Sequence, residues 1–495
     1  MSTKGIVVID QGTTSTRTIL FNLKGEILIT EQEEFKQIYP KNGWVEHSPD
    51  DIFKTVLSTL TRVIKKANDL DIIIIGIGIT NQRETTVLWD RKSGNPIHNA
   101  IVWQDRRTAD LCDDLKLDGN ENLIIDKTGL LLDPYFSATK ISYILDNTEG
   151  AREKARQGRI CFGTIDTYIL YKLTEGKSYL TDATNASRTS LLNIHSCQWD
   201  EDLLALFNVP KDILPEVCNS SHNFGTTSKA LLGYSIPIFS LIGDQQSAAI
   251  GQSCIQPGSL KSTYGTGCFI LVNTGEEIIK SKNKLISTIG YKINDSISYA
   301  LEGSIFISGA IVQWLRDGLQ IIKSAEETEY MASELEDNQG LYMVPALTGL
   351  GAPYWSPDAR GAIYGITRDT SPKHFVRAAL ESVAYQTHDL LEAIQSDGIK
   401  IGIVKVDGGM VNNEWLMQFL ANILNKKIRR PVVTETTAYG AALLTYFYSQ
   451  GLSDIGELEN FWKLDKEYIP CFKDNVRKKY IKEWKRAIHK TLDIK

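Results

Sequence analysis

The sequence predicts an α/β protein built from two large domains that hold a ligand between them. The chain has 495 residues, too many for one hydrophobic core. Strand-like apolar runs alternate with helical patterns along most of it, which is typical of α/β layers. A strand, a Gly-Thr turn and a second strand occur near residue 6 and again near residue 260. Two copies of one arrangement indicate a duplicated nucleotide-binding fold with a boundary near residue 251, although Gly-Thr turns are common enough to recur by coincidence.

The first copy combines residues suited to binding a phosphate. Ile6–Ile9 form an apolar run typical of a buried strand, and Asp10 ends it. Gly12 permits a tight turn, after which three hydroxyls face one spot, those of Thr13, Thr14 and Ser15. Arg17 adds positive charge. The Asp10 carboxylate is negatively charged, so it can help to bind a phosphate only when a cation such as Mg²⁺ lies between the two. The stretch therefore predicts a clamp for the phosphates of a magnesium nucleotide; the alternative is an ordinary hairpin turn.

The first half continues with alternating strands and helices. A turn at 23–26 joins strand-like runs at 18–22 and 27–30. Ser48 is expected to cap a helix whose apolar positions are Ile52, Val56, Leu60 and Ile64. The apolar run Asp71–Thr80 predicts a strand buried on both faces. Strands at 86–89 and 97–103 flank a further turn, and helical patterns follow at 105–115, 138–146 and 165–173.

The second half begins with a similar arrangement. Pro237–Ile242 predicts a strand, and a helix of small residues starts at Asp244. Further strands are expected at 260–263, 268–272 and 401–406, and helices at 304–319, at 372–394 and from about residue 413. The basic amphipathic tail at 473–492 could lie on a membrane surface. A helix docked on its own domain is favoured, because acidic residues interrupt the positive charge.

The composition argues against nucleic-acid-binding, disulfide-rich and membrane-spanning classes of protein. The net charge is -6, so a nucleic-acid partner is not expected. The seven cysteines are scattered without a CxxC pair, which favours a reducing compartment over a disulfide framework. No apolar run approaches the ~20 residues that span a bilayer, so no integral membrane segment is expected. We therefore expect a cytoplasmic enzyme or binding protein.

Charged residues follow the ends of two predicted strands. Arg83 and Glu84 come after the apolar strand at 71–80, a position more typical of a cleft than of a surface ion pair. Asp244 follows the strand at 237–242 and is suited to take the proton of an alcohol during phosphoryl transfer. An aspartate at such a junction is also a common helix N-cap, so both roles stay open. Because the sequence has no Walker A loop and no protein-kinase motif, nucleotide phosphates are left to the two Gly-Thr turns and the turn Gly408-Gly409.

Several longer stretches carry a resemblance to a known family. They are IDQGTTSTR (9–17), GITNQRETTVLWD (78–90), TDATNASRT (181–189), GDQQSAAIGQ (243–252), STYGTGCFILVNTGE (262–276), ALEGSIFISGAIVQWLRD (300–317) and VDGGMVNN (406–413). With these stretches in order over nearly the whole chain, the sequence resembles the FGGY carbohydrate kinases of the actin–sugar kinase–Hsp70 superfamily. The resemblance implies two actin-like (ribonuclease H-like) α/β domains, with mixed sheets flanked by helices. They would occupy residues 1–250 and 251–495, with the active site in the cleft between them.

The resemblance also implies an activity and its residues. The reaction would be phosphoryl transfer from ATP to glycerol, giving sn-glycerol 3-phosphate, with Mg²⁺ as the metal cofactor. By matched position Asp244 would be the general base, and Asp10 would serve the metal. The polyol site would comprise Arg83, Glu84, Trp103, Tyr135, Asp244, Gln245 and Phe269. The nucleotide would be held by Thr13, Thr14, Ser15, Arg17, Thr266, Gly309, Gln313, Gly409 and Asn413. The assembly would be a homodimer or homotetramer.

Three alternatives stay open. Trp103 and Phe269 could be ordinary core aromatics rather than walls of a polyol site. A kinase of the same family could act on a larger polyol or a ketose. An actin-like or chaperone-like nucleotide switch would share the fold, but it would not need the charged set Arg83, Glu84 and Asp244.

Overall fold

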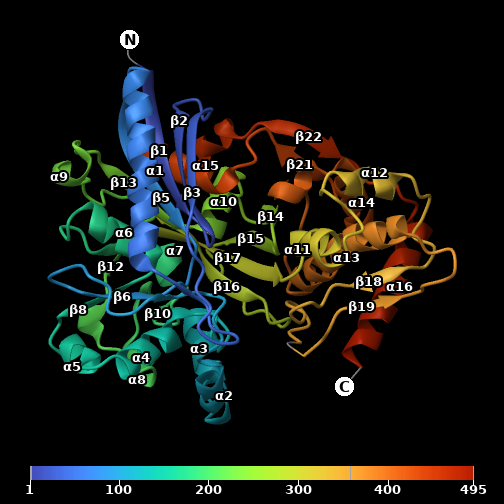
Figure 1. Ribbon diagram of the computed structural model, residues 1–495, viewed down its shortest axis with the longest axis horizontal. Coiled ribbons are helices and arrows are strands. Elements are labelled where there is room, and N and C mark those ends of the chain that lie inside the picture. Colours follow the sequence, from blue (N-terminus) through green and yellow to red (C-terminus); the bar gives the residue numbers. More distant parts are fainter. Residues whose placement is uncertain (1–2, 357, 494–495) are drawn as a thin grey trace.

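The computed structural model describes residues 3–356 and 358–493. Two lobes each surround a central sheet, with helices packed on the sheets (Figure 1). The first half of the chain forms most of one lobe, and the second half forms most of the other. None of the helices in these two ranges is long and apolar enough to cross a membrane.

The first sheet has its strands in the order β13-β5-β1-β2-β3. Their bounds are β1 Thr3–Gln11, β2 Ser15–Asn22, β3 Ile27–Glu34, β5 Ile72–Asn81 and β13 Ile238–Gly243. β1 pairs antiparallel with β2 and parallel with β5, which in turn pairs parallel with β13. The predicted hairpin after residue 22 is present, and the last six residues of β5 are buried. Because β1, β5 and β13 run in one direction, their carboxyl ends meet at one edge of the sheet.

The second sheet has the order β16-β17-β15-β14-β20-β21-β22. Its strands are β14 Leu260–Tyr264, β15 Cys268–Gly275, β16 Ile286–Ile293, β17 Ser296–Ile305, β20 Val404–Asp407, β21 Ile428–Pro431 and β22 Leu464–Tyr468. Within it, β17-β15-β14-β20-β21 repeat the order and the strand directions of β3-β2-β1-β5-β13. The repeat confirms the duplicated α/β fold that the two Gly-Thr turns predicted.

The remaining strands form short two-stranded pairs: β4 Glu46–His47 with β7 Ala100–Ile101, β6 Val87–Asp90 with β8 Ile160–Gly163, β9 Leu180–Asp182 with β12 Glu216–Cys218, β10 Leu192–Asn193 with β11 Gln198–Trp199, and β18 Tyr342–Val344 with β19 Ala362–Tyr364. The strand predicted at 97–103 is therefore shorter than expected. Trp89 of β6 forms an isolated bridge to Pro96, and Thr86, just before β6, forms another to Ile101. Proline has no N–H to donate, so a continuous ladder cannot form there.

The first-half helices are α1 Pro49–Asp69, α2 Ala109–Leu117, α3 Glu121–Thr128, α4 Ser137–Asn147, α5 Ala151–Arg156, α6 Ile165–Leu173, α7 Ala183–Ala186, α8 Glu201–Leu206, η1 Lys211–Ile213, α9 Lys229–Leu232 and α10 Asp244–Gly251. As predicted, Ser48 caps α1: its Oγ accepts a hydrogen bond from Asp51 N at 3.1 Å. The predicted apolar positions of α1 are all buried. This stripe holds α1 on β1, β2, β3 and β5 of the first sheet.

The second-half helices are α11 Gly309–Gln313, the π-helical turn η2 Trp314–Gly318, α12 Glu327–Ser333, α13 Pro372–Ser396, η3 Gly409–Asn412, α14 Glu414–Leu424, α15 Thr436–Ser449, η4 Ile455–Phe461 and α16 Asp474–Leu492. The helix predicted at 304–319 starts late, at Gly309. Ser304 and Ile305 still belong to β17, where they pair with Phe269 and Cys268 of β15.

Helix α15 joins the two lobes. It comes late in the sequence, yet it packs on β1, β5 and β13 of the first sheet and lies beside α10 (Figure 1). The approach of α10 and α15 is so close that a Cβ on Gly440 would lie 1.8 Å from Ser247 O. The chain therefore passes between the lobes at 252–259, 432–435 and 450–463. The division into domains 1–250 and 251–495 stays a prediction.

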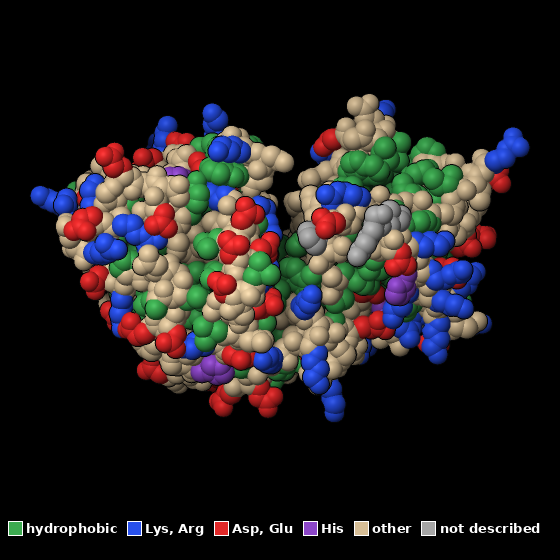
Figure 2. Space-filling model, turned by 90° about the horizontal axis from the view of Figure 1, so that it is seen from below, with side chains coloured by type: hydrophobic (Ala, Val, Ile, Leu, Met, Phe, Trp, Pro, Cys, Tyr) green, Lys and Arg blue, Asp and Glu red, His purple; other side chains and the backbone are tan. Residues whose placement is uncertain are grey.

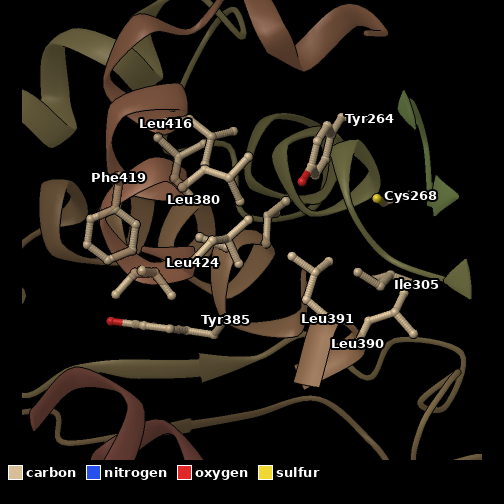
Figure 3. Close-up of a cluster of buried hydrophobic side chains, with 14 of the residues drawn as sticks. Tyr264, Cys268, Ile305, Leu380, Tyr385, Leu390, Leu391, Leu416, Phe419 and Leu424 are labelled. Atoms are coloured by element: carbon tan, nitrogen blue, oxygen red, sulfur yellow. The ribbon is translucent and has the colours of Figure 1, made fainter. Parts of the chain in front are cut away.

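A large apolar core lies under the second sheet. Figure 3 shows Leu390 and Leu391 of α13 beside Ile305 of the second sheet, with Tyr385 and Phe419 farther from the sheet in the same cluster. Trp484 of α16 is buried and stacks on Tyr385 with ring centres 5.2 Å apart. The tail is thus a helix docked on its own lobe, the favoured alternative, although Val476 in its first turn stays exposed.

Candidate active site

The carboxyl ends of β1, β5 and β13 bring the predicted residues together. In the register of the sheet, Asp10 lies opposite Thr80, and Gly243 lies opposite Asn81. The side chains of Asp10, Arg83 and Asp244 therefore leave the sheet at one edge. Residues of the second lobe also reach this edge, and Figure 2 shows a deep notch between the two lobes.

Arg83 is the most engaged side chain at this edge. Its Nε lies 3.1 Å from Asp244 Oδ1 and 4.0 Å from Glu84 Oε1. Its Nη1 donates to Glu302 Oε2 at 2.5 Å and its Nη2 donates to Glu302 Oε1 at 3.2 Å. The side chain is only 2% exposed, so the guanidinium is fixed between three carboxylates.

Two charged residues complete this cluster, and neither is among the predicted site residues. Arg188, which follows α7, donates from Nε to Glu84 Oε1 at 2.6 Å and from Nη2 to Glu302 Oε1 at 3.0 Å. Glu302 lies in β17, so the cluster spans both lobes. The sequence did offer a signal for both residues. Arg188 stands in the small-residue run TNASRT, and Glu302 stands in the mostly apolar run YALEGSI. Such a charge is costly to bury unless it is paired.

The two glutamates of the cluster differ in protonation behaviour. Burial tends to raise the pKa of both carboxyls. For Glu302 the attraction of Arg188 and Arg83 outweighs burial and lowers the pKa to about 2. For Glu84 burial outweighs the attraction of Arg188 and Arg83, so its pKa is raised. The distances explain the difference, because Glu302 accepts three N–H groups directly whereas Arg83 stays 4.0 Å from Glu84.

The backbone at Glu84 is unusual. Its φ is +61°, in the left-handed region that residues with a side chain seldom adopt. Ser137 Oγ donates to Glu84 O at 2.9 Å and helps to hold this conformation. Such strain persists where surrounding contacts enforce it, and it is often found at functional sites.

Trp103 and Tyr135 form an aromatic wall beside the charged cluster. Their rings meet edge to face with centres 5.6 Å apart, and the Arg188 guanidinium lies 5.7 Å from the centre of the Tyr135 ring. Trp103 Nε1 donates to Thr13 Oγ1 at 3.1 Å, which joins this wall to the first Gly-Thr turn. Both aromatics are half-buried, unlike the fully buried core residue Trp89. This position suits a wall of a site better than a core.

One face of the second sheet supplies the opposite wall. Leu271 lies opposite both Lys261 and Glu302 in neighbouring strands, and Phe269 is two residues before it. Phe269, Lys261 and Glu302 therefore project from one face of the sheet. Lys261 is buried and donates to Gln245 Oε1 and, at 3.3 Å, to Phe269 O. Gln245 and Phe269, from different lobes, thus lie close to the Arg83 cluster.

Asp10 fits the requirements of a magnesium ligand. Burial raises the pKa of its carboxyl to about 7; Arg17 opposes this, and Asp244 and Glu435 add to it. Within residues 3–356 and 358–493, no hydrogen bond or ion pair to this carboxylate is present. Neighbouring carboxylates favour a divalent cation, and Mg²⁺ prefers oxygen ligands. The residues present at this edge therefore suit the predicted metal.

The first Gly-Thr turn connects β1 with β2. Gly12 N donates to Ser15 O at 2.9 Å and closes the turn. The hydroxyl-bearing residues 13–15 are at least partly exposed. Arg17 forms an ion pair with Glu435, just before α15. To contact a phosphate, the Arg17 guanidinium must share or leave this pair.

The second Gly-Thr turn packs against two other turns. Gly309 N donates to Gly265 O at 2.8 Å, and Thr266 O accepts from the N–H groups of residues 308 and 310. Gly408 has a φ of +91°, and a Cβ there would lie 2.5 Å from Tyr264 O, so only glycine fits. The carboxyl ends of β14 and β20 therefore gather three predicted nucleotide residues, Thr266, Gly309 and Gly409.

The other two predicted nucleotide residues lie farther along. Asn413 caps α14, because its Oδ1 accepts from Leu416 N at 2.8 Å, and its Nδ2 donates to Thr328 Oγ1 at 3.2 Å. Gln313 is exposed at the end of α11. In the described parts of the chain, no hydrogen bond joins the turn at 12–15 to the turn at 265–267. The predicted nucleotide residues therefore lie on two walls whose Gly-Thr turns are not hydrogen-bonded to each other in the described parts of the chain.

A separate group of metal-type side chains lies on α13, formed by His388, Asp389 and Glu392. His388 Nδ1 is 3.6 Å from Asp389 Oδ1, whereas its Nε2 is 3.8 Å from Glu392 Oε1. The nearest approaches of the two carboxylates therefore use different ring nitrogens. Trp484 Nε1 donates to Asp389 at 2.6 Å, and Lys485 pairs with Glu392 at 2.8 Å. The group thus fastens α16 to α13.

Comparisons with known proteins agree with this architecture. A glycerol kinase of Sinorhizobium fredii is 52% identical over 490 residues, covering 98% of this chain and 99% of the relative. A glycerol kinase of Clostridium botulinum is 52% identical over 491 residues, covering 99% of each. The crystal structure of Plasmodium falciparum glycerol kinase with ADP superposes with a TM-score of 0.94 at 38% identity, covering 99% of this chain and 98% of that one.

A more distant structure shares the fold. The ligand-bound xylulose kinase of Lactobacillus acidophilus superposes with a TM-score of 0.89 at 22% identity, covering 99% of both chains. Residues 5–251 match the N-terminal domain of the FGGY family of carbohydrate kinases, and residues 260–448 match its C-terminal domain. These matches span most of the sequence, and the two matched parts contain the two sheets that repeat one strand order. The chain therefore belongs to the FGGY family of carbohydrate kinases.

Proposed function

We propose that this chain transfers the γ-phosphoryl group of ATP to glycerol, giving sn-glycerol 3-phosphate. The observation that carries the proposal is the cluster of Arg83, Glu84 and Asp244 at the sheet edge, with Asp10 beside Asp244. The relatives named glycerol kinase support glycerol as the acceptor. The ADP of one structural relative supports an adenine nucleotide as the donor.

The proposed acceptor site matches the chemistry of a small polyol. Glycerol presents a hydroxyl on each of its carbons, and each hydroxyl donates and accepts hydrogen bonds. Arg83 supplies donors, Glu84 and Asp244 supply acceptors, and an aromatic wall lies beside them. The full proposed set is Arg83, Glu84, Trp103, Tyr135, Asp244, Gln245 and Phe269. A tight polar ring of this kind favours a ligand that satisfies every buried group.

Asp244 is the proposed general base. Its side chain is about a third exposed, at 30%, so a substrate can reach it, and Arg83 Nε fixes its orientation at 3.1 Å. The Asp244 carboxylate accepts the proton of one primary hydroxyl of glycerol. The oxygen of that hydroxyl forms a bond to the γ-phosphorus while the bond from this phosphorus to the leaving ADP oxygen breaks.

The proposed nucleotide site uses both Gly-Thr turns. Residues 13–15 offer hydroxyl and N–H donors to the phosphates from the first lobe, and Arg17 adds charge. From the second lobe we propose Thr266, Gly309, Gln313, Gly409 and Asn413. Mg²⁺ held by Asp10 would neutralise charge on the phosphates during transfer.

An assay of ADP release against three acceptors tests the proposal. Glycerol should be a good substrate, and xylulose should be a poor one because we expect Trp103 and Phe269 to close the site around three carbons. The analogue 1,3-propanediol lacks only the central hydroxyl, so it leaves buried polar groups unpaired, and its kcat/KM should fall by up to about 10⁴-fold. Comparable values for glycerol and the diol would contradict the polar ring. A preference for xylulose would indicate a ketose kinase, and no acceptor-dependent ADP release would indicate a nucleotide switch.

We further propose a cytoplasmic location and a homodimeric or homotetrameric assembly. All seven cysteines are free thiols, and six of them are buried, which suits a reducing compartment. Sedimentation velocity of the purified protein measures the assembly directly. A monomer at micromolar concentration would contradict that part of the proposal.

A further inference from the structure

Glu302 is the point at which the second lobe holds the charged cluster of the first. Its Oε2 accepts from Arg83 Nη1 at 2.5 Å, and its Oε1 accepts from Arg83 Nη2 at 3.2 Å and from Arg188 Nη2 at 3.0 Å. All three side chains are at most 2% exposed. We call Arg83, Arg188 and Glu302 the Glu302 bridge. It is a fully desolvated ion-pair network between lobes, where geometry matters far more than on a surface.

Each arginine of the bridge also reaches a proposed substrate residue. Arg83 Nε lies 3.1 Å from the proposed base Asp244, and Arg188 Nε donates to Glu84 at 2.6 Å. The orientation of both acidic groups therefore depends on guanidiniums that Glu302 fixes from the other lobe. Removing the Glu302 charge leaves both guanidiniums without their common acceptor. The remaining carboxylates, Asp244 and Glu84, then attract them and shift their positions.

We propose that Glu302 is a positioning residue: it sets the geometry of the acceptor site and couples that geometry to the arrangement of the lobes. This inference rests on the proposed function for its substrate. Glu302 touches neither substrate nor the reacting atoms in this scheme, and it acts only through Arg83 and Arg188. Its removal should therefore change how glycerol is gripped.

Glu302→Gln tests the role, because glutamine keeps the size and loses the charge. We expect kcat/KM for glycerol to fall about 10²-fold, the loss typical of a misplaced reacting group. The preference for glycerol over 1,3-propanediol should shrink, since the grip on the central hydroxyl loosens. Glu302→Asp retains the charge at a shorter reach and should restore part of the loss. A role confined to folding would leave the glycerol-to-diol ratio unchanged, and that result would overturn the proposal.

Glu381→Gln is the matched control. Glu381 is also fully buried and pairs with an arginine, since Arg377 Nε donates to its Oε1 at 2.9 Å, but both residues lie in α13 within one lobe. This variant should lose stability and keep the wild-type selectivity. Small-angle scattering without ligands tests the coupling between Glu302 and the lobes independently of the proposed glycerol kinase activity. The radius of gyration should rise for Glu302→Gln but not for Glu381→Gln, and no rise would overturn the coupling. A wild-type protein inactive on glycerol would refute the proposed function and leave the scattering test intact.

Discussion

At the level of single residues, the contacts of Asp244 bear on the two roles suggested by its place between a strand and a helix. The N-cap of α10 is Gly243, not Asp244; Asp244 is the first residue of the helix, where its Oδ1 accepts from Gln245 N at 2.6 Å. The same oxygen lies 3.1 Å from Arg83 Nε. A helix-stabilising acid needs no such partner, so the Arg83 contact favours the role of base.

Asp244→Asn separates the two roles. The amide oxygen of asparagine can still accept from Gln245 N, so α10 should keep its start and the variant should still bind glycerol. Without a base for the attacking hydroxyl, kcat should fall about 10²–10⁴-fold. Steady-state kinetics with calorimetric glycerol titration measures both quantities. A variant with near-wild-type kcat would make Asp244 a structural residue of the helix start.

The raised pKa of Asp10 predicts a pH dependence of magnesium binding. Burial moves the pKa of this carboxyl from 3.8 to about 7, so it holds a proton below that pH. Mg²⁺ must displace the proton, and its affinity should fall by up to about tenfold per pH unit below 7. The same proton has the opposite effect on folding: in the absence of metal, it stabilises the folded protein at low pH. Between about pH 4 and 7 the Asp10 carboxyl holds more protons in the folded protein than in the unfolded chain, so without metal its contribution to the free energy of unfolding should decrease across this window as pH rises.

Thermal melting with and without Mg²⁺ at pH 6, 7 and 8 measures this effect without turnover. The increase in Tm caused by Mg²⁺ should be larger at pH 8 than at pH 6. Asp10→Asn should remove most of that increase and flatten its pH dependence. A stabilisation by Mg²⁺ that is equal in wild type and variant would place the metal elsewhere.

Sequence patterns found one side of the charged cluster and missed the other. Arg83, Glu84 and Asp244 follow apolar strands, and local spacing alone marks such positions. Arg188 and Glu302 were missed as site residues because their role depends on tertiary contacts. Glu302 is 219 residues from Arg83 in sequence, and no local period relates them. A buried charge in a small-residue run indicates that a partner exists, but it does not identify the partner.

At the level of elements, the strand-turn-strand units were predictable because all their determinants are local. An apolar run, a glycine and hydroxyl-bearing residues suffice to specify a strand and its tight turn. The start of α11 was not predictable in the same way. Ser304 and Ile305 belong to β17 only because β15 offers them pairing partners, and the small residues around them suit a helix equally well.

The turn after β20 gives a test at this level. Gly408→Ala should lower the free energy of unfolding by about 1–3 kcal/mol, because alanine at a φ of +91° is strained and its Cβ would meet Tyr264 O at 2.5 Å. Gly409→Ala, one residue on, is the control. No atom lies within 4 Å of the Cβ it would add, so its effect should stay within about 0.5 kcal/mol. Urea unfolding measures both, and equal losses would contradict the close approach.

At the level of the whole molecule, the two sides of the site differ in how they join the lobes. The acceptor side is already bridged by Glu302, which contacts Arg83 and Arg188 across the lobes. The phosphate side has no such bridge, since no hydrogen bond joins the turns at 12–15 and 265–267 among the described residues. The chain crosses between lobes at 252–259, 432–435 and 450–463. These crossings contain no strand and no α-helix, and their one regular element is the short 3-10 helix η4. These crossings can serve as hinges about the bridged side.

We therefore predict that nucleotide and acceptor together close the phosphate side. A nucleotide bound to both Gly-Thr turns must draw them toward each other, and closure excludes water from the phosphoryl group. Small-angle scattering should give a smaller radius of gyration with ADP and glycerol than without ligands, and ADP with 1,3-propanediol should close the lobes less. Using ADP avoids turnover during the measurement. If the radius of gyration is the same in all three states, the lobes do not move, and both turns must reach the nucleotide in the arrangement already present.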